Sequence, residues 1–237
     1  MINNDTTYLL DESLSCLTKI RQLQLDMSST TFAQLSEEDR SAKASDFAHQ
    51  ERICRTDLGL TTETLHMIGY LTAEIVDEFL VPEIVDRFAA MLNINLKHLV
   101  GPRATELKVK HPEKYGFEPK KLLAALIRIY LHLGGSPVFV KAIARDGRSY
   151  SSELFQNAIS TLRRTGALPP SDVDRLAAFY RACEQVVQED QSMEEQMGDI
   201  PDHFLGTFFF PSLNAILGAS RSVTLMAARS PWGKQIR

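Results

Sequence analysis

Apolar residues recur at three- and four-residue spacing along almost the whole chain, and this periodicity limits the fold more than any other feature of the sequence. No segment shows convincing alternation of apolar and polar residues between hairpin turns, which a half-buried strand requires. Several apolar faces are too wide for an isolated helix and must pack against other helices. The sequence therefore predicts an all-α fold, either a helical solenoid or an irregular helical array.

Capping residues and helix breakers divide this pattern into consecutive helices with short connections. Asp11 can cap a first helix, and Ser36 with Asp39 forms a capping pattern that opens a second, charged segment. We expect this charged segment to lie at the surface, with Phe47 and Ile53 as its anchors. Later helices are expected to begin at Pro82, Pro119, Pro137, Ser151 and Pro170, and to end at Gly101, Gly134 and Gly166.

Composition and charge narrow the class of protein. The net charge of -4 gives no general attraction to nucleic acid or to an anionic membrane. No apolar run approaches the ~20 residues that span a bilayer, and the polar N-terminus matches neither a secretory signal nor a transit peptide. Cys16, Cys54 and Cys183 are odd in number and far apart, which is typical of a reducing compartment. We therefore predict a location in the cytoplasm, the nucleus or both, and no membrane partner.

A search for catalytic chemistry gives no constellation. The six histidines are scattered, and none is paired with another ligand at the spacing of a metal site. Gly134-Gly135 lacks the context of a phosphate-binding loop, and no nucleophile elbow occurs. Cys183 lies on an apolar helical face, where an inert core thiol is expected. The sequence thus predicts no catalytic residue, no metal and no cofactor.

Basic residues between 108 and 121 surround Tyr115 and Phe117, a pattern that also occurs in nucleic-acid-binding segments. Three glutamates in and beside the same stretch dilute its charge. We therefore favour an ordered loop in which both aromatic rings plug the core, and we predict no nucleic-acid partner.

The segment from Arg145 to Tyr150 is the most pointed polar cluster. It has two interpretations. Arg145 and Arg148, together with Asp146, can form a partner-docking corner in which guanidinium groups recognise carboxylates or backbone carbonyls. Alternatively the segment is a helix-ending turn, with Gly147 in the left-handed conformation and Asp146 bonded to backbone amides or to an arginine. Turn chemistry of this kind is common and is the favoured interpretation.

Ten stretches of the chain form a recognisable pattern. They are residues 8–14, 63–65, 70–72, 79–80, 82–87, 89–93, 107–110, 112–117, 146–150 and the Gly-Asp-Ile-Pro-Asp sequence at 198–202. In order and spacing they resemble the core domain of the ubiquitin conjugation factors that elongate ubiquitin chains, and the resemblance extends from about residue 8 to residue 205.

The resemblance implies an armadillo-like helical solenoid and a role in polyubiquitination that leads to proteasomal breakdown. It also implies three kinds of partner: a ubiquitin-conjugating enzyme, ubiquitinated substrates and an AAA-type segregase ATPase. In this family the ligase activity belongs to a C-terminal U-box, a metal-free fold that promotes discharge of ubiquitin from the conjugating enzyme without a covalent intermediate.

The tail departs from the family pattern. Residues 1–205 are expected to form the C-terminal part of the core domain, and residues 206–237 an atypical tail that is too short for a U-box and carries no Asp or Glu. A break of this kind predicts a shifted reading frame, a retained intron or a truncated gene model. Two functions follow: the core fragment of a chain-elongating ubiquitin ligase, or a non-catalytic helical scaffold or antagonist that binds the same partners.

Overall fold

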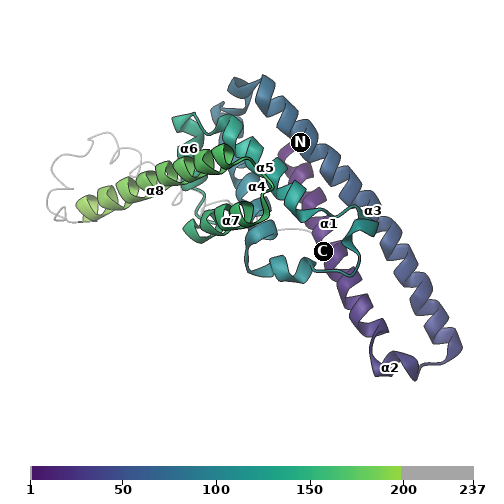
Figure 1. Ribbon diagram of the computed structural model, residues 1–237. Coiled ribbons are helices and arrows are strands. Elements are labelled where there is room, and N and C mark those ends of the chain that lie inside the picture. Colours follow the sequence, from purple (N-terminus) through teal and green to yellow (C-terminus); the bar gives the residue numbers. More distant parts are fainter. Residues whose placement is uncertain (1, 199–237) are drawn as a thin grey trace, which may run out of the picture. The chain divides into compact units, whose positions relative to one another are not determined.

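The computed structural model describes residues 2–198, which form helices joined by short connections (Figure 1). No strand occurs within this range, so the predicted all-α class is confirmed. The described residues up to Gln188 belong to one compact unit, and the last turns of the final helix belong to a second unit. The part of the chain from residue 206 onward, predicted to be an atypical tail, lies outside the described residues.

The first layer is a pair of long helices, α1 (Ile2–Met27) and α3 (Glu37–Glu74), which run side by side in opposite directions and are connected through the short α2 (Thr30–Ala33) (Figure 1). Their contact buries Leu14, Leu17 and Ile20 of α1, as the apolar spacing predicts. A buried hydroxyl pair, Ser13 with Thr61 at 2.7 Å, lies in the same interface.

Asp11 does not cap α1, because the helix begins well before it at Ile2. Its carboxylate instead contacts Nε2 of His98 at 2.9 Å. The prediction of a helix start at Asp11 is therefore wrong. An acidic residue ahead of an apolar run looks the same in the sequence whether it caps a helix or lies within one, so the local pattern could not separate the two.

The cap of α3 is as predicted. The hydroxyl of Ser36 accepts from the amide of Asp39 at 3.1 Å and donates to its carboxylate at 2.6 Å. The charged segment and the apolar pattern that follows it form one continuous helix of 38 residues. Phe47 and Ile53 are the half-buried anchors of its charged part, also as predicted.

The remaining helices follow α3 along the chain. They are α4 (Pro82–Val100), α5 (Pro119–Leu133), α6 (Pro137–Ala144), α7 (Ser152–Thr165) and α8 (Pro170–Gly198), with the 3₁₀ helices η1 (Val76–Phe79), η2 (Pro102–Leu107) and η3 (Pro112–Tyr115) between them. Four of the five begin with the proline that the sequence places at the first helical position, where its missing N–H leaves no bond unmade. Gly166 ends α7 at φ 63°, in the left-handed region expected of a C-terminal glycine.

An aromatic cluster forms the centre of the second half of the fold. The ring of Tyr130 meets Phe155 edge-on with centroids 5.6 Å apart, and Phe139 packs against Phe179 at 5.8 Å. Such pairs add about 0.5–1.5 kcal/mol each beyond the burial of their surface. The four rings come from α5, α6, α7 and α8, so this cluster holds the four helices together, with Phe139 in the first turn of α6. Among the described helices, none is both long enough and apolar enough to cross a bilayer.

Candidate docking corner

The chain leaves α6 through a tight turn, defined here as residues 145–150 and called the docking corner. Its backbone is closed by the carbonyl of Asp146, which accepts from the amides of Ser149 at 3.4 Å and Tyr150 at 3.0 Å. This helical type of closure keeps φ negative, and Gly147 is not among the positive-φ glycines of the described chain. The prediction of a left-handed Gly147 is therefore wrong, although the segment is a helix-ending turn as predicted.

The carboxylate of Asp146 is held from the inside of the fold. One oxygen accepts from the side-chain amide of Asn93 on α4 at 3.0 Å, and the other from the backbone amide of Arg148 at 3.3 Å. Asn93 is itself saturated, because it accepts from the hydroxyl of Tyr130 at 2.9 Å and donates to the carbonyl of Ile143 at 3.2 Å. Tyr130 and Asn93 are almost fully buried, so this network acts at low dielectric, where paired polar groups specify geometry strongly. The predicted bond from Asp146 to a backbone amide is confirmed.

The far end of the corner is tied to α8. Glu184 accepts from the hydroxyl of Tyr150 at 2.6 Å and from that of Ser152 at 2.7 Å, both at the same carboxylate oxygen. Burial and the hydrogen bond to Glu184 raise the pKa of Tyr150 well above its ordinary value, so the hydroxyl remains a donor. Bonds to α4 and α8 thus hold the corner from both sides.

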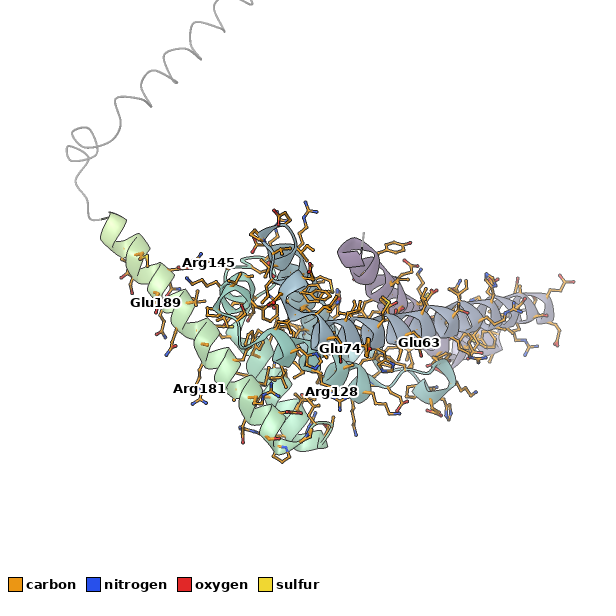
Figure 2. The ribbon with its side chains drawn as sticks, turned by 90° about the horizontal axis from the view of Figure 1, so that it is seen from above. Glu63, Glu74, Arg128, Arg145, Arg181 and Glu189 are labelled. Atoms are coloured by element: carbon orange, nitrogen blue, oxygen red, sulfur yellow. The ribbon has the colours of Figure 1, made fainter. Side chains whose placement is uncertain are left out.

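The charged groups that the corner presents to solvent are cations. Arg145, labelled in Figure 2, is exposed. Arg148 is exposed too, and so is Lys141, one helical turn before Arg145. Asp146 has a different role from the two arginines, because its carboxylate bonds to Asn93 and to the turn. The three predicted residues lie in one turn, and the structure gives them different roles: Asp146 anchors the turn, and Arg145 and Arg148 are exposed. That they contact a partner stays a prediction.

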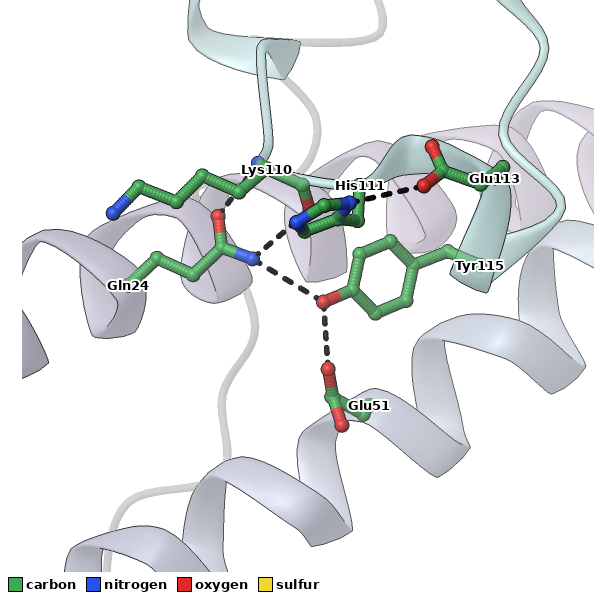
Figure 3. Close-up of polar contacts among 6 residues, drawn as sticks. All are labelled: Gln24, Glu51, Lys110, His111, Glu113 and Tyr115. Carbon is green, nitrogen blue, oxygen red and sulfur yellow. Dashed lines mark hydrogen bonds and ion pairs between the residues drawn. The ribbon is translucent and has the colours of Figure 1, made fainter.

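A second hydrogen-bond network, which the sequence analysis did not predict, holds the basic loop before α5 (Figure 3). The hydroxyl of Tyr115 donates to Glu51 at 2.7 Å and accepts from the side-chain amide of Gln24 at 3.3 Å. Gln24 also accepts from the backbone amide of Lys110 at 2.8 Å. Tyr115 is 1% exposed and Phe117 4%, which confirms the prediction that both rings plug the core. A ring buried in this way is not available to stack on a nucleic-acid base.

No metal centre forms among the residues whose side chains the structure describes: no three His, Cys, Asp or Glu of these residues come together around one point. All three cysteines are buried, and burial raises the pKa of Cys54 and of Cys183 to about 12. The prediction that Cys183 is a core thiol is confirmed. A thiol in such surroundings stays protonated and is a poor nucleophile.

Comparison with known proteins identifies the family. The family model described as "Ubiquitin elongating factor core" matches residues 1–184. The chain is 41% identical over 207 residues to "Ubiquitin conjugation factor E4" of Schizosaccharomyces pombe, covering 87% of this chain and 20% of that protein. It is 36% identical over 223 residues to "E4 ubiquitin-protein ligase UFD2" of Saccharomyces cerevisiae, covering 92% of this chain and 23% of that protein. It therefore spans about a fifth of the length of these relatives. The chain belongs to the ubiquitin elongating factor core family.

Proposed function

We propose that the chain is a core fragment of a ubiquitin chain-elongating ligase, acting in polyubiquitination that directs proteins to proteasomal breakdown. The observation that carries the proposal is the 41% identity over 207 residues to the fission-yeast conjugation factor. The name of the budding-yeast relative, an E4 ubiquitin-protein ligase, supports the same activity. The proposal includes an armadillo-like solenoid arrangement of the helices and a location in the cytoplasm and nucleus.

The mechanism that fits these residues is positioning. A rigid helical core that holds a ubiquitin-conjugating enzyme beside a ubiquitinated substrate, with an AAA-type segregase ATPase delivering that substrate, raises their effective concentration. Cys16, Cys54 and Cys183 are 2% exposed or less, so none is placed to carry ubiquitin as a thioester. Ubiquitin would then pass directly from the conjugating enzyme to the growing chain.

The docking corner is the proposed contact for one of these partners. Arg145 and Arg148 are included because a guanidinium group can pair with a carboxylate through two hydrogen bonds, and the anchored Asp146 fixes the turn that carries both residues. Reversing both charges, Arg145→Glu with Arg148→Glu, is expected to weaken binding of that partner by about tenfold, mainly through a slower association rate, because the new carboxylates would repel the partner's own. Lys120→Glu, at an exposed position on α5, is the matched control and should leave binding unchanged.

A second candidate function is a non-catalytic scaffold, or an antagonist that occupies the same partners unproductively. The observation in its favour is that the matching family model is that of the core, over residues 1–184, whereas the resemblance places the ligase activity in a U-box. In this case the chain binds its partners as tightly as a ligase does but adds nothing to the rate of ubiquitin transfer.

A reconstituted reaction separates the two. It contains ubiquitin-activating enzyme, a ubiquitin-conjugating enzyme, ubiquitin and a substrate carrying one ubiquitin, with or without the 237-residue chain. Chain growth above the reaction without the protein supports the ligase fragment. No growth, together with measured binding to the conjugating enzyme or substrate, supports the scaffold. A reaction that shows no chain growth, together with no measurable binding, would contradict both functions.

A further inference from the structure

Helix α3 carries two rows of residues at the spacing used for helix–helix packing. The first row faces α1 and α5 and is buried; it consists of Cys54, Leu58, Thr61, Leu65, Ile68 and Thr72, at alternating intervals of four and three. The second row, called here the exposed seam, consists of Leu60, Glu63, Met67, Tyr70 and Glu74, at alternating intervals of three and four. At about 100° per residue the two rows lie on opposite sides of the helix.

The apolar members of the exposed seam are large and open to solvent. Leu60 is 51% exposed, Met67 48% and Tyr70 68%. Single exposed apolar residues are ordinary, but a line of them at coiled-coil spacing has the geometry into which a second helix packs its side chains. Exposed Ile75 and Ile84, just beyond the helix, extend the apolar surface.

Gly59, beside Leu60, gives a second and independent indication. It lies in the interior of a long helix, where glycine is about 1 kcal/mol less favourable than alanine. A Cβ atom at this position meets nothing within 4 Å, and its φ is not positive, so neither packing nor backbone conformation within the described fold requires glycine here. A small residue at this point allows the backbone of another helix to approach closely.

The surface around the exposed seam is acidic, which favours a basic partner. Residues 56–86 contain no Lys or Arg. The acidic residues of the same stretch are Asp57, Glu63, Glu74, Asp77, Glu78, Glu83 and Asp86. Figure 2 labels Glu63 and Glu74, the two carboxylates of the seam itself, along α3. Two copies of this seam packed together would bury these carboxylates with no cation from either copy, which is unfavourable.

We propose that the exposed seam of α3 docks a basic amphipathic helix from another protein. Its apolar residues, at matching three- and four-residue spacing, pack along Leu60, Met67 and Tyr70. Its flanking Lys or Arg side chains pair with Glu63 and Glu74, which fixes the register of the two helices.

The test uses a fluorescein-labelled peptide of about three heptads, with Leu at the two core positions of each heptad, Lys at the flanking positions and Ala elsewhere. Its binding to the 237-residue chain is followed by fluorescence anisotropy, beside a scrambled peptide of the same composition. We expect saturable binding of the patterned peptide that weakens as salt is raised, and much weaker binding of the scrambled one. Equal binding of the two peptides would overturn the proposal.

Two double variants locate the site. Glu63→Lys with Glu74→Lys, and Met67→Ser with Tyr70→Ser, are each expected to weaken binding by about tenfold or more. The matched controls are Asp46→Lys, elsewhere on α3, and Leu25→Ser, which is 50% exposed on α1; both should bind as the unmodified chain does. All six substitutions in these four variants fall on exposed side chains, so equal melting temperatures are expected. Unchanged affinity in either double variant contradicts the proposal.

Two further measurements exclude other occupants. Sedimentation should show that the unmodified chain does not dimerise through the exposed seam. A dimer that the double variant Met67→Ser with Tyr70→Ser dissociates would assign the seam to a second copy and overturn the proposal. A second possible occupant is a helix elsewhere in the same, longer polypeptide. The same titration on the fission-yeast relative, which is about five times as long as its aligned region, tests this. Binding there keeps the partner in a separate protein. Loss of binding would assign the seam to the relative's own chain and overturn the proposal.

Discussion

The side-chain amide of Asn93 donates to the carboxylate of Asp146 across 3.0 Å, and this bond ties the turn after α6 to the interior of α4. Asn93 is 1% exposed and also accepts from the hydroxyl of Tyr130. Tyr130 and Asp146 therefore both depend on Asn93, which links them. A saturated buried network of this kind fixes one arrangement of the surrounding helices.

Replacing Asn93 with alanine should lower the free energy of unfolding by about 2–4 kcal/mol, because it leaves a buried hydroxyl and a carboxylate without their partner. Urea denaturation followed by circular dichroism measures the change. Asn157→Ala, at a half-buried position on α7, is the control and should change the free energy of unfolding by no more than about 0.5 kcal/mol. A loss below about 1 kcal/mol for Asn93→Ala would mean that the network contributes little to stability.

Two adjacent glycines after α5 should respond differently to alanine. A Cβ at Gly134 would lie 2.8 Å from the carbonyl oxygen of Tyr130 and 3.0 Å from Cδ2 of Phe179, whereas one at Gly135 meets nothing within 4 Å. Gly134→Ala should therefore destabilise the fold by about 1–3 kcal/mol through overpacking. Gly135→Ala should be neutral or slightly stabilising, because it restricts the unfolded chain. Parallel thermal melts compare the two, and equal melting temperatures would contradict the assignment.

The parts of the fold that the sequence predicts are those whose cause is local. Pro82, Pro119 and Pro137 mark helix starts because a proline has no amide to leave unpaired, and this property is independent of distant residues. Burial of Leu14, Leu17 and Ile20 follows from their spacing alone. In these cases the residues that determine the feature are close together in the sequence.

The remaining features depend on contacts between distant residues. The partner of Asp146 is Asn93, 53 residues earlier, and the partner of Tyr115 is Gln24, 91 residues earlier. No local signal distinguishes Asn93 from a surface asparagine. The sequence shows which residues make up the docking corner. Only the fold shows that Asp146 anchors the turn while Arg145 and Arg148 are exposed.

The thiol groups should be unreactive while the chain is folded. Cys54 and Cys183 are 0% exposed, and burial raises the pKa of each to about 12. At mildly alkaline pH the native chain should react with an aromatic disulfide reagent at least about 10³-fold more slowly than the chain in denaturant, because reaction requires opening of the fold. A thiol that reacts rapidly in the native chain would reopen the question of a thioester-forming cysteine.

His132 should make the fold less stable as the pH falls. Its Nδ1 lies 3.0 Å from the hydroxyl oxygen of Thr72, and that hydroxyl donates its own proton to the carbonyl of Ile68 at 2.9 Å. His132 must therefore donate to Thr72 through an Nδ1 proton. Burial, and then the nearby cations of Arg175 and Arg128, hold the pKa of His132 below its ordinary value.

The sign of the effect follows from that shift. A group with a lowered pKa in the folded state takes up a proton more readily in the unfolded state, so the stability it contributes is present at neutral pH and is lost as pH falls below about 6.5. His132→Asn keeps an amide donor for Thr72 and does not titrate. Between about pH 7.5 and about pH 5.5, the unmodified chain should lose more free energy of unfolding than this variant loses. His49→Asn, at an exposed position on α3, should follow the unmodified chain, whereas parallel curves for His132→Asn and the unmodified chain would show that His132 does not sense pH in this fold.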